Sequence, residues 1–106
     1  MAQNKVFSML GLATKAGKTV SGEFSTEKAL KDGKAAMVIV AEDASENTKK
    51  HFSDMCSYRH IPCYFYGKRD VLGHAIGKEM RASLAVTDKN FSGSIQKLIT
   101  ASQQEG

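Results

Sequence analysis

The chain has 106 residues, of which 42% are hydrophobic and 25% charged, so it can bury a core and has ordinary globular composition. Its formal net charge is +4 at pH 7, which favours a polyanionic partner. There is no long apolar run and no signal-peptide pattern at the start, so we expect no membrane segment and a cytoplasmic protein. The only cysteines, Cys56 and Cys63, match no metal motif, and we expect reduced thiols and no metal.

The first half of the chain predicts two helices and two strands. Apolar side chains on one face predict a helix over 4–16, and Gly17 lies just beyond its end. A short extended segment over 18–21 follows, and Gly22 turns the chain into a helix over 23–32. Residues 36–41 are continuously apolar and rich in β-branched side chains, which predicts a central strand covered on both faces.

The second half continues the alternation. Ser45 is the predicted N-cap of a helix over 46–59, and Pro62 prevents that helix from continuing. Asp88 is the predicted cap of a last helix, whose polar end at 101–106 we expect to fray. Between them the pattern predicts a strand over 63–66, a short helix over 69–76 and a strand over 83–87.

This alternation predicts the fold class. No repeat and no Pro/Gly/Ser-rich linker divides the chain, so we expect one domain over 1–106. Alternating helices and strands predict an α/β protein, a three-layer α/β/α sandwich around a four-stranded mixed sheet.

The sequence offers little for catalysis. None of the three histidines lies at a metal-ligand spacing from another ligand, and surface or structural roles are the commoner reading. Glu42 and Asp43 follow a buried strand, as catalytic carboxylates often do, but the favoured alternative is that Asp43 and Ser45 bind N–H groups of the next helix. Gly17-Lys18-Thr19 resembles the end of a phosphate-binding loop, but it follows a helix and not a strand.

Basic residues give a better signal. The start of the helix after Gly22 presents free N–H groups, which favour an anion. Four lysines lie in the surrounding sequence, at positions 15, 18, 28 and 31, while Lys78 and Arg81 lie in the loop before the last strand. In a four-stranded sandwich the two segments can lie at one edge. The alternative, that these lysines form only a solvated face, stays open at this point.

The chain resembles a known family at several motifs. These are Ser21-Gly22-Glu23 with Lys28, the strand and acidic pair MVIVAED, Ile61-Pro62-Cys63-Tyr64, Val71-Leu72-Gly73 with Gly77, and the segment from Ala82 to Val86. In order and spacing they are similar to the ribosomal L-seven-Ae/L-thirty-e superfamily of kink-turn RNA-binding proteins. The segment GLATKAGKTVSGE resembles its small bacterial YlxQ-like branch. The resemblance extends from residue 4 to about 100.

The resemblance implies an α/β/α sandwich that binds sharply kinked RNA and needs no cofactor. In the family the strand–helix turn contacts paired G·A mismatches, and the loop before the last strand covers a flipped-out base. A kink crowds phosphates and exposes base edges, which suits a basic protein. The resemblance and the nearby basic residues together give the expected RNA-binding residues: Lys18, Gly22, Glu23, Phe24, Ser25, Lys28, Lys31, Gly77, Lys78, Glu79, Met80 and Arg81.

One departure from the family pattern concerns base recognition. The strongest RNA binders of the family carry an Asn-Glu pair where this chain has Phe24 and Ser25. A bidentate base contact contributes ~1–3 kcal/mol of discrimination, so specificity for the standard kink-turn is expected to be weaker. Arg81 replaces a residue that is usually small or apolar, and it adds phosphate affinity.

The sequence therefore predicts a non-enzymatic, ribosomal-protein-like RNA-binding protein that recognises a kink-turn or similar structured RNA, ribosomal RNA included. Two alternatives stay open. One is a ribosome-associated protein-interaction module with weak RNA binding. The other is a small nucleotide-handling enzyme that uses the helix start at Gly22 with Glu42 and Asp43.

Overall fold

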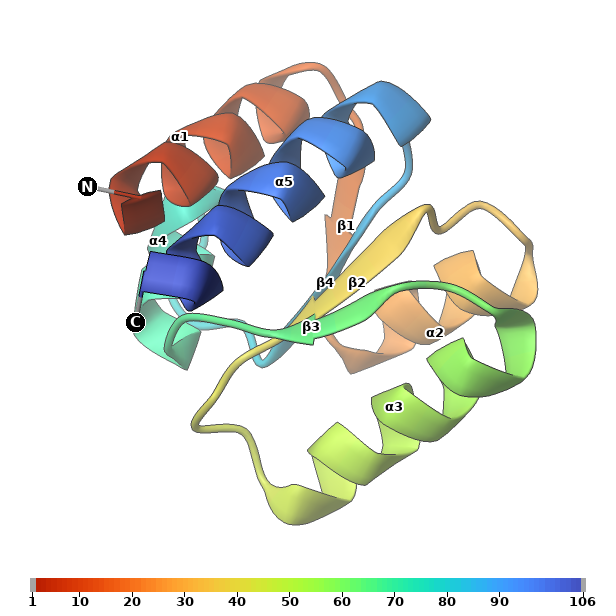
Figure 1. The fold of residues 1–106 in the computed structure, drawn as a ribbon. Helices are drawn as coiled ribbons and strands as arrows, with labels where there is room; N and C mark the ends of the chain where they lie inside the picture. Colours follow the sequence, from red (N-terminus) through yellow and green to blue (C-terminus); the bar gives the residue numbers. More distant parts are fainter. Residues whose placement is uncertain (1, 106) are drawn as a thin grey trace.

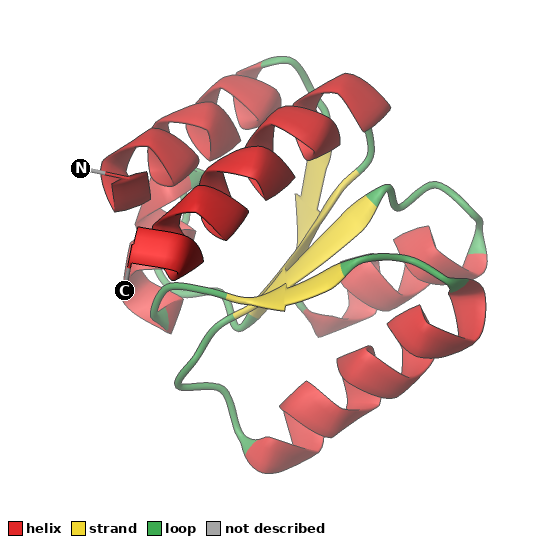
Figure 2. Ribbon diagram, in the orientation of Figure 1, coloured by secondary structure: helices red, strands yellow, loops and turns green. Residues whose placement is uncertain are grey.

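Helices and strands alternate along the chain in the order that the apolar periodicity predicted (Figure 2). The structure, a computed structural model, describes residues 2–105. Each predicted element is present. The elements are α1 (Ala2–Lys15), β1 (Thr19–Ser21), α2 (Glu23–Lys31), β2 (Met37–Val40), α3 (Glu46–Arg59), β3 (Cys63–Phe65), α4 (Arg69–Ala75), β4 (Ser83–Val86) and α5 (Lys89–Glu105).

The four strands form one mixed sheet in the order β1-β4-β2-β3. β4 pairs antiparallel with both β1 and β2, whereas β2 pairs parallel with β3. Both inner strands are buried along their whole length, which confirms that the apolar run around β2 is a central strand. Antiparallel pairing places Ser21, the last residue of β1, opposite Leu84 in β4. The turn after β1 therefore meets the loop that leads into β4.

Helices cover both faces of the sheet, which gives the predicted three-layer α/β/α sandwich (Figure 1). On one face, α1 packs along α5 and also against α4; on the other, α2 and α3 lie side by side. The apolar faces that predicted these helices make up the core. Its fully buried side chains include Val6, Leu10, Phe52, Leu72, Ile95 and Ile99.

Side-chain caps begin two of the helices where the sequence predicted them. The Thr48 N–H donates to Ser45 Oγ at 3.1 Å at the start of α3. The Phe91 N–H donates to Asp88 Oδ2 at 2.8 Å at the start of α5. At the other end of α3, His60 adopts a left-handed conformation with φ 58°, two residues before the proline that cannot continue the helix.

The last helix is longer than the sequence indicated. α5 continues to Glu105 and so includes most of the polar segment over 101–106 that we expected to fray. Across residues 2–105, no helix combines the length and apolar character that a bilayer span requires.

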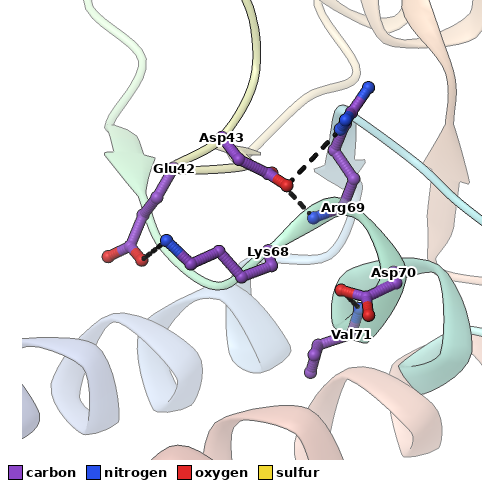
Figure 3. A network of polar contacts seen from close by, with 6 residues as sticks. All are labelled: Glu42, Asp43, Lys68, Arg69, Asp70 and Val71. Atoms are coloured by element: carbon purple, nitrogen blue, oxygen red, sulfur yellow. Dashed lines mark hydrogen bonds and ion pairs between the residues drawn. The ribbon is translucent and has the colours of Figure 1, made fainter.

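The acidic pair after β2 holds the start of α4 (Figure 3). The Arg69 N–H donates to Asp43 Oδ1 at 2.9 Å, and Arg69 Nε lies 3.5 Å from Asp43 Oδ2. Beside it, Lys68 Nζ lies 3.7 Å from Glu42 Oε1. The interpretation that Asp43 binds α3 was wrong, because the Glu42 N–H bonds to the Gly67 carbonyl and brings the end of β2 beside α4 instead.

This contact also sets the ionisation of Asp43. Desolvation opposes the charged form, but the Arg69 N–H and guanidinium outweigh it, so the pKa of Asp43 lies below its usual value. Asp43 therefore has a structural role at the start of α4.

Candidate nucleic-acid interface

A glycine turn joins β1 to α2. Gly22 has φ 92° and ψ 162°, a conformation that costs a residue other than glycine ~1–3 kcal/mol. A Cβ at this position would meet no atom within 4 Å, so the backbone conformation, and not lack of space, requires glycine. The Gly22 N–H donates to the Ser83 carbonyl at 2.9 Å and fastens the turn to the start of β4.

The first turn of α2 presents unpaired donors. No side chain caps this helix, and its first internal bond runs from the Thr26 N–H to the Gly22 carbonyl at 3.0 Å. The N–H groups of Glu23, Phe24 and Ser25 consequently have no partner among residues 2–105. Such groups at the positive end of a helix dipole can bind a phosphate or a base-edge acceptor.

The α4–β4 loop, residues 76–82, is held by α4. The Lys78 N–H donates to the Gly73 carbonyl at 2.8 Å, and the Arg81 N–H donates to the Arg69 carbonyl at 3.1 Å. Gly73 is buried within α4, and a Cβ there would lie only 2.7 Å from the Glu79 carbonyl oxygen. The loop backbone can therefore approach α4 this closely only because residue 73 is a glycine.

Arg81 joins the glycine turn and the loop. Its Nε donates to Ser21 Oγ at 3.1 Å, and its Nη1 donates to the Met80 carbonyl at 2.7 Å. The same arginine lines a groove of about 340 Å³ together with Ser25 and Lys78. Two cationic groups thus lie beside the first turn of α2, whose N–H groups are unpaired.

The outer side of the loop is open to solvent. Gly77 turns the chain there with φ 77°. Lys78, Glu79 and Arg81 line a hollow of about 680 Å³. Met80 is 49% exposed and offers an apolar surface next to these charges.

Lys28 and Phe24 lie on the outer face of α2. Lys28 Nζ donates to Asp32 Oδ2 at 3.0 Å, and this bond holds the pKa of Asp32 below its usual value. Phe24 is 77% exposed, which is unusual for so large an apolar side chain. Phe24, Lys28, Lys31 and Asp32 line one shallow hollow of about 260 Å³. A ligand that binds Lys28, the lysine of the motif that resembles the family, must therefore compete with Asp32 for its ammonium group.

Two of the predicted site residues lie away from the turn. The Thr87 N–H donates to the Lys18 carbonyl at 2.8 Å, so Lys18 lies at the end of the sheet opposite Gly22. Lys31 is in the last turn of α2, at the far end of that helix. The structure thus brings residues 22–25 and 77–81 together and separates Lys18 from them, whereas Lys31 shares the outer hollow of α2 with Phe24.

Two positioning residues, Ser21 and Gly73, were not among the predicted site residues. The Ser21 hydroxyl binds Arg81, and Gly73 allows the loop to pack on α4. A glycine inside a predicted helix is a sequence signal for close backbone approach, so Gly73 could have been found. Ser21 belongs to a motif that matches the family, but the sequence did not show its contact with Arg81, which lies 60 positions away in the chain.

His51 and Cys56 have structural contacts, whereas His74 is exposed and lines the same hollow as Lys78 and Glu79. His51 Nε2 is 2.8 Å from Glu27 Oε1 on the neighbouring helix. The side chain of Cys63 and burial raise the pKa of Cys56, so its thiol stays protonated. Among residues 2–105, no three His, Cys, Asp or Glu side chains come together as a metal site.

The fold and this surface define a small α/β/α sandwich with an uncapped helix start and a basic loop at one end of its sheet. Residues 4–96 match the model of the Ribosomal protein L7Ae/L30e/S12e/Gadd45 family, and the chain belongs to this family. The resemblance found in the sequence is confirmed.

The relatives also place the chain near the YlxQ branch. The chain is 43% identical over 93 residues to the RNA-binding protein YlxQ of Bacillus subtilis (strain 168), covering 88% of this chain and 93% of that protein. It is 37% identical to the RNA-binding protein YlxQ of Enterococcus faecium, covering 92% and 93%. A solved structure of a protein of unknown function from Bacillus halodurans C superposes with a TM-score of 0.88 at 40% identity, covering 91% and 97%.

Proposed function

We propose that this protein is a ribosomal-protein-like RNA-binding protein and that it recognises a kink-turn or a similarly bent RNA. The observation that carries the proposal is the hydrogen bond from Arg81 to Ser21. It joins the turn after β1 and the loop before β4 into one surface. Membership of the L7Ae/L30e/S12e/Gadd45 family and identity to two RNA-binding YlxQ proteins support it.

The chemistry of the surface suits bent RNA. Lys78 and Arg81 supply positive charge where a kink crowds phosphates. The unpaired N–H groups of residues 23–25 are donors for a phosphate or a base edge. Met80 and Phe24, both exposed, provide apolar surfaces on which an unstacked base can lie.

A second candidate function rests on Phe24. This side chain is 77% exposed where the strongest RNA binders of the family carry an amide, and Ser25 replaces their carboxylate. An exposed aromatic residue is also a common anchor in protein interfaces. The alternative is therefore a ribosome-associated protein-interaction module that binds RNA weakly.

The proposal assigns the protein no enzymatic role and no cofactor. Its support is the family, whose description names ribosomal proteins, and the relatives, whose names describe RNA binding. A cytoplasmic location and association with the ribosome follow from such a role. The free thiols of Cys56 and Cys63 fit a reducing compartment.

The test is a binding titration with two RNAs of equal length and charge, a kink-turn and a straight duplex, at several salt concentrations. Tighter binding to the kink-turn at every salt concentration is expected, because only the bent RNA presents crowded phosphates and unstacked bases together. Equal and weak binding to both RNAs would contradict kink-turn recognition and favour the protein-interaction module.

A further inference from the structure

Four exposed lysines surround the carboxyl end of β4, at the opposite end of the sheet from Gly22. We call them the β4-end lysine cluster, and its members are Lys15, Lys18, Lys34 and Lys89. They lie in or directly beside three separate connections: the one between α1 and β1, the one between α2 and β2, and the one between β4 and α5. In Figure 1 the α1–β1 and β4–α5 connections lie at the ends of α1 and α5 that are away from the chain termini, and the α2–β2 connection lies at the same end of the sheet, on the side of α2.

Backbone contacts bring the three connections together. The Thr87 N–H donates to the Lys18 carbonyl at 2.8 Å, and Lys89 follows two residues later. The Ala36 N–H donates to the Val86 carbonyl at 2.8 Å, and Lys34 precedes Ala36 by two residues. Lys15 ends α1, three residues before Lys18. The cluster is therefore a consequence of strand order, since residues from 15 to 89 meet at one strand end.

The charge of this cluster is not neutralised by ion pairs. Within residues 2–105, none of the four lysines forms a salt bridge, whereas Lys28, Lys49, Lys50 and Lys68 each lie within 4.0 Å of a carboxylate. Two aspartates lie nearby: Asp88 accepts a hydrogen bond from the Phe91 N–H, and Asp32 accepts one from Lys28 Nζ, while the charge of Lys34 also helps to lower the pKa of Asp32. The four lysines therefore outnumber the carboxylates at this end. A good part of the net positive charge of the chain thus lies at this end.

We propose that the β4-end lysine cluster binds the phosphate backbone of the same RNA, on a helical segment that flanks the bend. This inference rests on the proposed function. β1 is an edge strand of three residues, so the two basic ends are separated by only about 10 Å of strand. Long lysine side chains at loops and helix ends suit phosphates, which need charge but no fixed geometry, and they add affinity without reading sequence.

The experiment uses two variants of equal charge and two RNAs. Lys34→Gln with Lys89→Gln removes two charges from the cluster and leaves the residues around Gly22 and Arg81 unchanged. Lys49→Gln with Lys50→Gln, in the first turns of α3, removes two charges from the other side of the molecule and is the matched control. Each protein is titrated at several salt concentrations with a kink-turn RNA trimmed to the bend and with the same RNA carrying a longer flanking duplex.

The wild-type protein should bind the longer RNA more tightly and with a steeper salt dependence than the trimmed RNA. The cluster variant should lose this gain: its salt slope on the longer RNA should fall by roughly two units, and its affinity by roughly tenfold at moderate salt. Its binding to the trimmed RNA should be unchanged. The control variant should resemble the wild type on both RNAs, and circular dichroism should show that both variants are folded.

The outcomes separate this inference from the proposed function. The proposed role of the cluster would be disproved if the wild type bound both RNAs with equal affinity and equal salt slope. It would also be disproved if the control variant lost as much affinity for the longer RNA as the cluster variant. Neither result would contradict RNA binding at Gly22 and Arg81. Failure of the wild type to bind either RNA would disprove the proposed function and the cluster together.

Discussion

The two ends of the sheet are both basic, but they differ in how their charges are held. At the Gly22 end, the Arg81 guanidinium is fixed by bonds to Ser21 Oγ and to the Met80 carbonyl. At the β4-carboxyl end, the lysines have no ion-pair partner within residues 2–105 and lie on loops or at helix ends. Fixed donors can discriminate between base edges, whereas mobile charges can only attract phosphates.

This difference indicates which end of the sheet determines RNA specificity. The Gly22 end depends on two glycines for different reasons: Gly22 for its positive φ, and Gly73 for the close approach of the loop. The opposite end also has two glycines with positive φ, Gly17 and Gly33, but a Cβ at either would meet no atom within 4 Å, so no close backbone approach depends on them. Changes at the Gly22 end should therefore alter which RNA is bound, and changes at the other end should alter only how strongly RNA is bound.

The largest effect is expected from Gly73→Ala. The added Cβ would lie 2.7 Å from the Glu79 carbonyl oxygen, so the loop backbone must move. We expect the free energy of unfolding to fall by about 1–3 kcal/mol, as in other overpacked sites. Kink-turn affinity should fall roughly tenfold, because Arg81 moves with the loop. Denaturant unfolding and RNA titration measure the two effects.

The matched control for that variant is Gly93→Ala in α5. Gly93 is also helical, but a Cβ there would meet no atom within 4 Å. Alanine has the higher helix propensity, so stability should rise by about 1 kcal/mol with RNA binding unchanged. Equal behaviour of the two variants would contradict the role of Gly73 in positioning the loop.

Substitution of Arg81 separates geometry from charge. Arg81→Ala should weaken kink-turn binding roughly tenfold and lower the salt slope by about one unit. Arg81→Lys keeps the charge but cannot bond Ser21 Oγ and the Met80 carbonyl with one planar group, so the slope should persist while kink-turn selectivity falls. If Arg81→Lys keeps the wild-type selectivity for the kink-turn over the straight duplex, Arg81 acts only as a point charge.

The double substitution Phe24→Asn with Ser25→Glu brings the family's base-reading pair to the first turn of α2. It should increase selectivity for the kink-turn over a straight duplex by ~1–3 kcal/mol, because base-edge bonds are restored. The added carboxylate should lower binding to the straight duplex. Both RNAs are titrated at one salt concentration. A uniform loss on both would instead support the protein-interaction module.

The smallest effect is expected at Lys28. Lys28→Ala should weaken binding a few-fold and lower the salt slope by roughly one unit. Asp32→Asn should strengthen binding by a similar factor, because it removes the carboxylate that now accepts a hydrogen bond from Lys28 Nζ. Removal of Lys28 should also raise the pKa of Asp32 toward its ordinary value, which an NMR pH titration detects. No change in binding for either variant would remove Lys28 from the RNA site.

Local patterns in the sequence were sufficient for the elements and the fold class. The apolar spacing of α1, the continuous apolar run of β2 and the caps Ser45 and Asp88 depend on residues a few positions apart. The alternation of these elements predicted the α/β/α sandwich, and the order of the motifs identified the family, which the match over residues 4–96 confirms.

Only the tertiary structure decided which residues share a surface. Sequence proximity grouped Lys18 with Gly22, yet β1 separates them onto opposite ends of the sheet. Asp43 holds Arg69 in α4 and not the helix that follows it in the chain, and Ser21 binds Arg81 across 60 positions. These contacts follow from the strand order β1-β4-β2-β3. Strand order is set by the burial of whole elements against one another. The hydrophobic periodicity of a single element does not indicate which other element will lie next to it.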